Sequence, residues 1–285
     1  MRAGRPPRST MRHAAFFMPR AACAIGASHP ACRALNDDGV ISSIAMHLSK
    51  VSAISFDLDD TLWPFGPSVE RAEASLHAWL IAHAPNTASV LPASQALSQL
   101  RDEYERLRPD LVGDYRALRI GSIRLALERA NEDVTLTDRA YDVFYSARNQ
   151  VEFFDDVLPA LAWLSARFPL IAVTNGNADL GLTGGGEFFR ETLSARAFGF
   201  AKPEPEIFHA AAATLGVPAA ELLHVGDDFH LDIVGALNAG LQAAWVVRRQ
   251  DTEAEHAAQR APSPHLTVRD LSVLCRALGG PVEAS

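Results

Sequence analysis

Short runs of apolar and β-branched residues alternate with helical stretches through much of the chain. The apolar runs cover residues 51–56, 170–174, 222–225 and 243–247, and the helical stretches cover residues 157–167, 205–215 and 232–239. Strands that are buried on both faces of a parallel sheet have this continuous apolar character. The alternation with helices therefore predicts a doubly wound α/β core, in which helices cover both faces of a parallel sheet.

One long segment interrupts this alternation, because its apolar positions follow a helical period and no strand pattern occurs in it. On the first predicted helix, Val69, Leu76 and Leu80 fall on one face. Three further helices are predicted over residues 92–107, 115–130 and 137–149. We therefore expect residues 67–149 to form an all-helical domain of four helices, inserted after the first strand of the core.

The beginning of the chain differs in composition from the rest. Residues 1–45 contain six arginines, two acidic residues and no sustained hydrophobic period. Arginine-rich, acid-poor segments are typical of targeting presequences, but a start upstream of the true initiator Met46 is the simpler interpretation. We expect residues 1–47 to be an extension without a packed fold, so that the core covers residues 48–66 and 150–278.

Charge and cysteine content restrict the possible partners. The chain has a formal net charge of −8, and without residues 1–45 it has 20 basic and 32 acidic residues. This acidic balance argues against nucleic acid as a partner, and no apolar run approaches the roughly 20 residues of a membrane span. Outside the extension Cys275 is the lone cysteine, which suits a reducing compartment. We therefore predict a cytoplasmic protein that is a monomer or a homodimer.

Two aspartates at the end of the first apolar run are the first candidates for chemistry. Asp57 and Asp59 are two residues apart, so the period of an extended chain directs both carboxylates to the same side. One could act as a nucleophile and the other as a general acid and base. A solvated pair of loop residues would give the same pattern, and features further along the chain decide between the two interpretations.

A carboxylate that attacks a phosphate dianion needs nearby cations. At ~4 Å and an effective dielectric constant near 20, the repulsion between the two groups is roughly 8 kcal/mol. Mg²⁺ suits this task, because it prefers oxygen ligands and needs only one or two carboxylates. Asp227 follows the predicted strand at residues 222–225, after Gly226, where the backbone can turn closely. We therefore predict Asp227 as the third acidic residue of a magnesium site.

Lys202 is the second candidate cation. It is one of two lysines in a chain with 24 arginines, and Pro203 follows it. A compact ammonium fits among carboxylates and a phosphate more easily than a broad guanidinium does. A lysine before proline is also common in surface loops, so the order of the other motifs supports the functional interpretation.

Several polar residues complete the candidate site. Thr174, Asn175 and Gly176 end the predicted strand at residues 170–174 and could bind an anionic group there. Asp228 and Asp232 are the residues that could support the site from behind. His224 is predicted to be structural, and His230 could contact the substrate or support the site. Asp232 could cap helical amides or hold a metal-bound water.

Four motifs occur in order along residues 51–247. They are DLDDT at residues 57–61, TNG at residues 174–176, KP at residues 202–203 and GDDFHLD at residues 226–232. Together they resemble the ordered motifs of the haloacid dehalogenase (HAD) superfamily. The resemblance implies a Rossmann-like core, and it implies that the helical insert is a cap of the family's first type, which closes over the site.

The same resemblance implies a role for each motif residue. Asp57 would form an aspartyl-phosphate, and Asp59 would protonate the leaving group and then activate water. Mg²⁺ would be held by the Asp57 carboxylate, the Asp59 backbone carbonyl and Asp227. The phosphoryl group would be bound by Thr174, Asn175, Gly176 and Lys202.

Longer runs around these motifs look most like a bacterial branch of the superfamily that acts in riboflavin metabolism. That branch dephosphorylates FMN and 5-amino-6-(5-phosphoribitylamino)uracil. In the cap, Tyr115, Arg116 and Arg119 could contact a polar leaving group, although a solvated helix face is the simpler interpretation of these residues.

Other activities of the same fold are alternatives. A 2-haloacid dehalogenase needs one nucleophilic carboxylate and no metal, so the presence of Asp59 and Asp227 favours phosphoryl transfer. A phosphonatase would need a cap lysine, and none occurs between residues 51 and 201. A phosphoglycolate-type phosphatase, a sugar-phosphate mutase and a non-catalytic binding module remain open.

Overall fold

The computed structural model describes residues 48, 50–91, 93–111, 113–248 and 262–280. The predicted extension over residues 1–47 lies outside these described residues. Within the described ranges, no helix is both long enough and apolar enough to cross a membrane.

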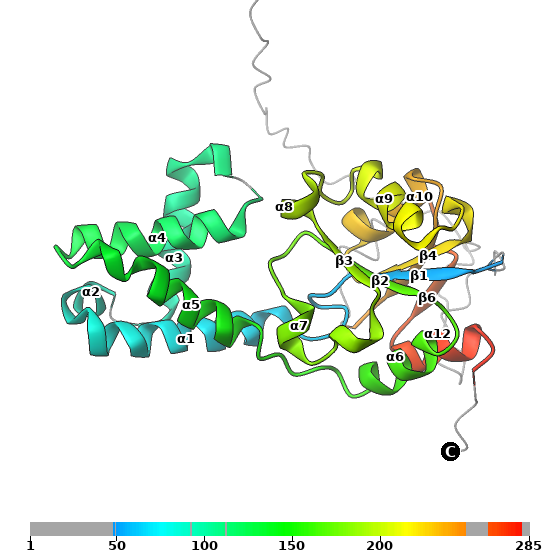
Figure 1. Cartoon of the computed structure of the whole chain (residues 1–285), viewed down its shortest axis with the longest axis horizontal. Helices are drawn as coiled ribbons and strands as arrows, with labels where there is room; N and C mark the ends of the chain where they lie inside the picture. The colour runs from blue at the N-terminus through cyan, green and yellow to red at the C-terminus, as the bar shows by residue number, and fades with distance from the viewer. Residues whose placement is uncertain (1–47, 49, 92, 112, 249–261, 281–285) are drawn as a thin grey trace, which may run out of the picture. The chain divides into compact units, whose positions relative to one another are not determined.

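Six parallel strands form the sheet of the described chain, in the order β3-β2-β1-β4-β5-β6 (Figure 1). They are β1 (Ala53–Phe56), β2 (Leu170–Thr174), β3 (Glu191–Ser194), β4 (Leu222–Gly226), β5 (Gln242–Val246) and β6 (Leu266–Val268). The four predicted apolar runs correspond to β1, β2, β4 and β5, which lie in the middle of the sheet and are fully buried. The predicted doubly wound fold is therefore confirmed.

Helices cover both faces of this sheet (Figure 1). The core helices are α6 (Val157–Ser165), α7 (Leu180–Thr183), α8 (Ala195–Phe198), α9 (Pro205–Leu215), α10 (Gly235–Asn238) and α12 (Leu271–Ala277), with 3₁₀ turns at Gly186–Phe188 and Ala219–Glu221 and a π-helical turn, η5, at Phe229–Val234. α6 and α12 pack on the face that carries Ile54 and Phe56. α9, η5 and α10 pack on the opposite face, which carries Ala53.

The parallel register aligns the carboxyl ends of the three central strands. Phe56 of β1 pairs with Ala172 of β2 and with Val225 of β4. The backbone N–H of Asp57 then donates to the carbonyl of Val225 at 2.9 Å. The residues that follow β1, β2 and β4 therefore lie together at the edge of the sheet where ligands bind in open α/β folds.

Two strands were not predicted from the sequence. β3 reads Glu-Thr-Leu-Ser and is exposed or half-buried along its length, and β6 has three residues. Both lie at the edges of the sheet. Because an edge strand is less fully covered than a central one, neither has the apolar run by which the central strands were recognised.

The insert between β1 and α6 has a hydrophobic core of its own, which includes Leu76, Leu97 and Phe144. Its helices are α1 (Phe65–His83), α2 (Pro85–Val90), α3 (Gln95–Leu107), α4 (Tyr115–Arg129) and α5 (Thr137–Arg148), with 3₁₀ turns at Pro109–Leu111 and Val134–Leu136. The predicted number of four helices was wrong, since Pro85 begins the additional short helix α2 in a favourable first-turn position. The helix predicted from residue 92 begins at Gln95.

Candidate active site

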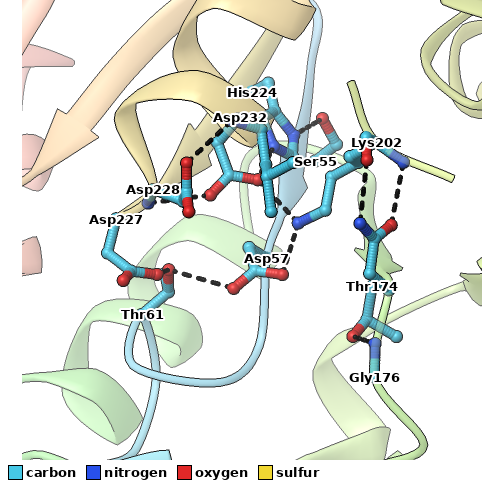
Figure 2. Close-up of polar contacts among 12 residues, drawn as sticks. Ser55, Asp57, Thr61, Thr174, Gly176, Lys202, His224, Asp227, Asp228 and Asp232 are labelled. Carbon is cyan, nitrogen blue, oxygen red and sulfur yellow. Dashed lines mark hydrogen bonds and ion pairs between the residues drawn. The ribbon is translucent and has the colours of Figure 1, made fainter. Parts of the chain in front are cut away.

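A buried lysine lies at the centre of the site, between two carboxylates (Figure 2). Nζ of Lys202 lies 2.5 Å from Oδ1 of Asp57 and 2.6 Å from Oδ1 of Asp232. All three residues are buried. Burial favours the neutral amine, but the charges of the two aspartates outweigh this effect and raise the pKa of Lys202. The lysine is therefore a permanent cation beside the predicted nucleophile.

The loop after β2 holds the backbone of Lys202. The side-chain amide of Asn175 donates from Nδ2 to the carbonyl of Lys202 at 2.9 Å, and its Oδ1 accepts from the Lys202 N–H at 2.8 Å. These two bonds connect residues 27 positions apart in the sequence. The predicted phosphate-binding residue Asn175 thus contacts another predicted site residue directly.

Asp232 uses both carboxylate oxygens within the core. Oδ1 accepts from Lys202 and lies 3.1 Å from Nε2 of His224, and Oδ2 accepts from the backbone N–H of Asp228 at 3.0 Å. Burial works to raise the pKa of Asp232, but Lys202 and His224 outweigh it and lower this pKa to about 2. Asp232 is therefore a fixed anion that holds the lysine in place.

His224 and Gly226 fix the position of Asp232 from the side of β4. Nδ1 of His224 lies 2.9 Å from the hydroxyl of Ser55, so the ring bridges two strands (Figure 2). Burial lowers the pKa of His224 and favours the neutral ring. A Cβ atom on Gly226 would overlap the carboxylate carbon of Asp232, so this position requires glycine.

Asp228 begins the turn that carries Asp232. Its Oδ1 accepts from the backbone N–H groups of His230 and Leu231, both at 2.8 Å. The side chain of Asp228 therefore caps η5. The sequence had left this capping role open for Asp232 and not for Asp228. The described contact of His230 with the site is this backbone hydrogen bond.

Asp57 and Asp227 face each other across the end of β1 and β4. One carboxylate oxygen each from Asp57, Asp227 and Asp232 lies within 4.8 Å of the others. Thr61 donates to Oδ1 of Asp227 at 2.8 Å and lies 3.4 Å from Oδ2 of Asp57. Burial raises the pKa of Asp57 to about 7, against the opposing effect of Lys202. Burial and the neighbouring charge of Asp57 raise the pKa of Asp227 to about 8.

These raised pKa values mark a pair of carboxylates that needs a cation. The buried carboxylate of Asp57 and the half-buried carboxylate of Asp227 offer hard oxygen ligands, which are the ligands of Mg²⁺. Asp232 is already committed to Lys202 and His224. Asp57 and Asp227 are therefore the carboxylates that fit a divalent cation at this position.

The side chain of Asp59 turns away from this pair. Its Oδ1 accepts from the indole N–H of Trp63 at 2.8 Å. Nη2 of Arg148 donates to both carboxylate oxygens, at 2.5 and 2.7 Å. Arg148 is the last residue of α5, so a residue of the insert holds the predicted acid and base.

All nine predicted site residues line one cavity of about 630 Å³. They are Asp57, Asp59, Thr174, Asn175, Gly176, Lys202, Asp227, Asp228 and Asp232. Within the cavity wall, the Gly176 N–H donates to the hydroxyl of Thr174 at 2.9 Å. A Cβ on Gly176 would lie 2.8 Å from Oδ2 of Asp59. Glycine at this position therefore leaves room beside the acid.

The opposite wall of the cavity belongs to the insert. It includes Phe65, Ser98, Tyr115, Arg119 and Phe144. The solvated helix face expected for Arg119 was wrong, since this residue is 4% exposed, donates to Glu73 at 3.0 Å and lies 4.3 Å from the ring centre of Phe144. The guanidinium of Arg116 lies 5.0 Å from the ring centre of Tyr141. The insert thus lines the 630 Å³ cavity with aromatic rings and with Arg119, whereas Arg116 and Tyr141 line a neighbouring cavity.

Comparison with known proteins decides the family. Residues 51–240 match the family model of the haloacid dehalogenase-like hydrolases. The chain belongs to this family. The predicted membership of the HAD superfamily is therefore confirmed. We refer to the helical insert below as the cap.

Two of the relatives similar in sequence are named as phosphatases. This HAD hydrolase is 32% identical over 231 residues to the 5-amino-6-(5-phospho-D-ribitylamino)uracil phosphatase YigB of Escherichia coli K12. The match covers 80% of this chain and 96% of that relative. It is 30% identical over 207 residues to a glyceraldehyde 3-phosphate phosphatase of Methanopyrus kandleri, with coverage of 70% and 84%. These similarities confirm the prediction of a phosphoric monoester hydrolase.

A solved structure with a different name is also similar to this HAD hydrolase. It is a 2-haloacid dehalogenase from Pseudomonas syringae pv. tomato DC3000, with 34% identity and a TM-score of 0.69. The match covers 80% of this chain and 98% of that chain. It therefore includes the cap as well as the core.

Three residues that contact the acidic groups had no assigned role at the sequence level: Thr61, Trp63 and Arg148. Thr61 ends the DLDDT motif and Trp63 follows two residues later, so their place in the chain could have indicated them. Arg148 gave no comparable signal, because it is one of many arginines and lies 89 positions from Asp59.

Proposed function

We propose that this HAD hydrolase is a Mg²⁺-dependent phosphatase that cleaves a small-molecule phosphate monoester through an aspartyl-phosphate on Asp57. The observation that supports this most strongly is the 2.5 Å contact between Lys202 and Asp57, in a cavity that Asp227 also lines. A nucleophilic carboxylate, a fixed cation and a second carboxylate that can hold a metal ion are the groups that phosphoryl transfer to an aspartate requires.

Each residue has a defined task in this proposal. Oδ2 of Asp57 attacks phosphorus, because Oδ1 is held by Lys202. Lys202 offsets the negative charge of the transferring group. Asp59 protonates the leaving oxygen and afterwards takes a proton from the water that cleaves the aspartyl-phosphate. Asp57 and Asp227 would hold Mg²⁺, which supplies further positive charge at the phosphoryl oxygens.

The nucleophile is tested by the substitution Asp57→Asn. We expect kcat for p-nitrophenyl phosphate to fall at least ~1,000-fold, since the amide is a poor nucleophile. Asp155→Asn is the matched control, because Asp155 is exposed outside the cavity. Rapid quenching with ³²P-labelled substrate should label the peptide that contains Asp57 in the wild type and not in the variant. Activity of Asp57→Asn within tenfold of the control would refute the assignment.

We propose FMN or 5-amino-6-(5-phosphoribitylamino)uracil as the substrate. Both carry a flat heterocycle on a flexible ribityl phosphate, and the YigB relative is named for the second. A second cavity of about 440 Å³ shares Tyr115, Asn175 and Gly176 with the first and is also lined by Tyr141 and Tyr145. The rings of these last two tyrosines stack at 5.7 Å. Aromatic walls suit a leaving group that carries a planar ring.

The substrate is tested by comparing kcat/KM for several esters. The ribityl phosphates should exceed glyceraldehyde 3-phosphate and phosphoserine by at least tenfold in the wild type. Tyr141→Leu should reduce this preference and leave the rate with glyceraldehyde 3-phosphate unchanged. Equal kcat/KM values for all four esters would contradict the proposed substrate and leave the phosphatase activity intact.

A 2-haloacid dehalogenase is the second candidate, because a similar solved structure has that name. Such an enzyme would release halide from 2-chloropropionate without Mg²⁺, and the same purified protein can be assayed for both reactions. The paired carboxylates of Asp57 and Asp227 favour the phosphatase. A mutase or a binding module would not release phosphate from the ester in repeated turnovers, so the same assay distinguishes both from a phosphatase. The cytoplasmic location and the monomeric or dimeric state remain predictions.

A further inference from the structure

Arg148 is a buried cation at the junction between the cap and the core. It is the last residue of α5 and is 1% exposed. Nη2 contacts both oxygens of Asp59, and the guanidinium carbon lies 5.3 Å from the ring centre of Phe65. A cation at the carboxyl end of a helix is favoured by the helix dipole, so both the fold of α5 and the Asp59 carboxylate stabilise this position.

One nitrogen of this guanidinium is not used. Nη1 of Arg148 is buried and has no hydrogen-bond partner among the described residues. A buried polar group without a partner is energetically unfavourable, and more so when the group is charged. A second anionic acceptor beside Asp59 would remove this cost, so the unused nitrogen indicates where such an acceptor binds.

The location of Arg148 identifies the acceptor by its chemistry. Arg148 lines the same cavity as Asp57, Lys202 and Thr174. The group that must lie between Asp57, which attacks it, and Asp59, which protonates its leaving oxygen, is the phosphoryl group of the ester. Guanidinium groups bind phosphate oxygens with two parallel donors or share their donors between two anions.

We propose that Arg148 is a further catalytic residue, contributed by the cap: Nη2 orients Asp59 while Nη1 donates to a non-bridging oxygen of the phosphoryl group. This deepens the proposed function and rests on it. The phosphoryl site then has one cation from the core, Lys202, and one from the cap. Because α5 ends at Arg148, the site is complete only when the cap is docked against the loop after β1.

The test measures phosphate binding as well as turnover. Arg148→Met removes the guanidinium and keeps the length of the side chain, and Arg139→Met is the matched control on the exposed face of the same helix. Binding of inorganic phosphate at saturating Mg²⁺ is measured by titration calorimetry, and kcat/KM is measured with p-nitrophenyl phosphate. We expect Arg148→Met to weaken phosphate binding at least tenfold and to lower kcat/KM about 100-fold or more, with both values unchanged in the control.

Arg148→Lys serves as a second variant if the methionine variant does not fold. Lysine is shorter than arginine and lacks the fork of two donor nitrogens by which Nη2 contacts Asp59 while Nη1 faces the phosphoryl group, so phosphate binding should still weaken at least fivefold. Phosphate affinity within twofold of the control, in whichever variant is folded, overturns the proposal. A fall in kcat/KM with unchanged phosphate affinity also overturns it, because Arg148 would then act only through Asp59. If the wild type binds phosphate through Arg148 but does not turn over esters, the proposed function fails and the contact stands.

Discussion

At the scale of single residues, the proposed reaction depends on the charge of Lys202, which lies beside the proposed nucleophile Asp57. The carboxylates of Asp57 and Asp232 hold the ammonium of Lys202, and the side-chain amide of Asn175 holds its backbone. Asp232 depends in turn on Gly226, where a side chain would overlap it. A residue without chemistry of its own therefore controls the electrostatics of the site.

Gly226→Ala should inactivate the enzyme for this reason. The added methyl forces Asp232 to move, and Lys202 loses one of its two carboxylate partners, so we expect kcat/KM to fall at least ~100-fold. Gly66→Ala is the control, because a Cβ there meets nothing within 4 Å and alanine is the better helix former. Steady-state kinetics with p-nitrophenyl phosphate checks both. Activity of Gly226→Ala within threefold of wild type would contradict the role given to Asp232.

The residues that line the cavity from the core domain could be predicted from the sequence, whereas their contacts with one another could not. Motif order placed nine residues that line one cavity, because strand ends bring such residues together. The side chain of Asn175, however, bonds to the Lys202 backbone, and Asp228 caps η5. These contacts depend on the backbone conformation of the loops, and the pattern of hydrophobic residues does not predict that conformation.

At the scale of elements, the cap is stabilised by a buried ion pair as well as by its apolar core. Arg119 of α4 donates to Glu73 of α1, and both side chains are 5% exposed. Ser98 of α3 donates to the same carboxylate. Helices α1, α3 and α4 therefore meet at the buried carboxylate of Glu73. This contact explains why Arg119 occupies a buried position where an apolar residue would otherwise be expected.

Arg119→Met should destabilise the protein by about 3 kcal/mol or more, because it leaves Glu73 buried without its cation. Urea unfolding measures this change. The double variant Arg119→Met with Glu73→Met should recover much of the loss, and Arg124→Met should cost about 0.5 kcal/mol or less, since its pair with Glu128 is exposed. A loss below 1 kcal/mol in the single variant would show that the pair contributes little.

Elements in the middle of the sheet were predictable because burial on both faces leaves a continuous apolar run. β2 and α9 have the predicted bounds, residues 170–174 and 205–215. β3 and β6 are edge strands and lack that pattern. In the cap, α2 was missed because six residues are too short to establish a helical period.

At the scale of the whole molecule, the two raised aspartate pKa values connect metal binding to stability. Asp57 and Asp227 have pKa values of about 7 and 8 in the folded chain, against 3.8 for an ordinary aspartate. A folded-state pKa above the unfolded value contributes stability that is present at low pH and is lost as the pH rises through the folded pKa. Without a cation, stability should therefore fall between about pH 4 and pH 8.

Thermal unfolding with EDTA and with Mg²⁺ checks this dependence. We expect Tm with EDTA to fall as the pH rises from 5 to 8, and Mg²⁺ to raise Tm more at pH 8 than at pH 5. Asp227→Asn should flatten the dependence, because an amide does not ionise. A Tm with EDTA that is constant or rises over this range would contradict the proposed pairing of the two carboxylates.

The division into a core and a helical insert was readable from the change in hydrophobic period. The contact that joins the core and the insert could not be predicted, because Arg148 and Asp59 are 89 positions apart and no sequence pattern connects them. Long-range pairs of this kind follow from how the cap docks, and docking is decided by packing that a single sequence does not display.

The cap enters the chain between β1 and α6, before the second strand, whereas the loops of the proposed active site follow β1, β2 and β4, and Lys202 lies in the loop between α8 and α9. Evolution can therefore rewrite almost all of the cap without altering the hydrolytic machinery. Under the proposal for Arg148, the exception is this final arginine of the cap. A chimera that grafts a foreign cap onto this core should acquire the donor's preference among esters only if the graft restores a guanidinium at position 148.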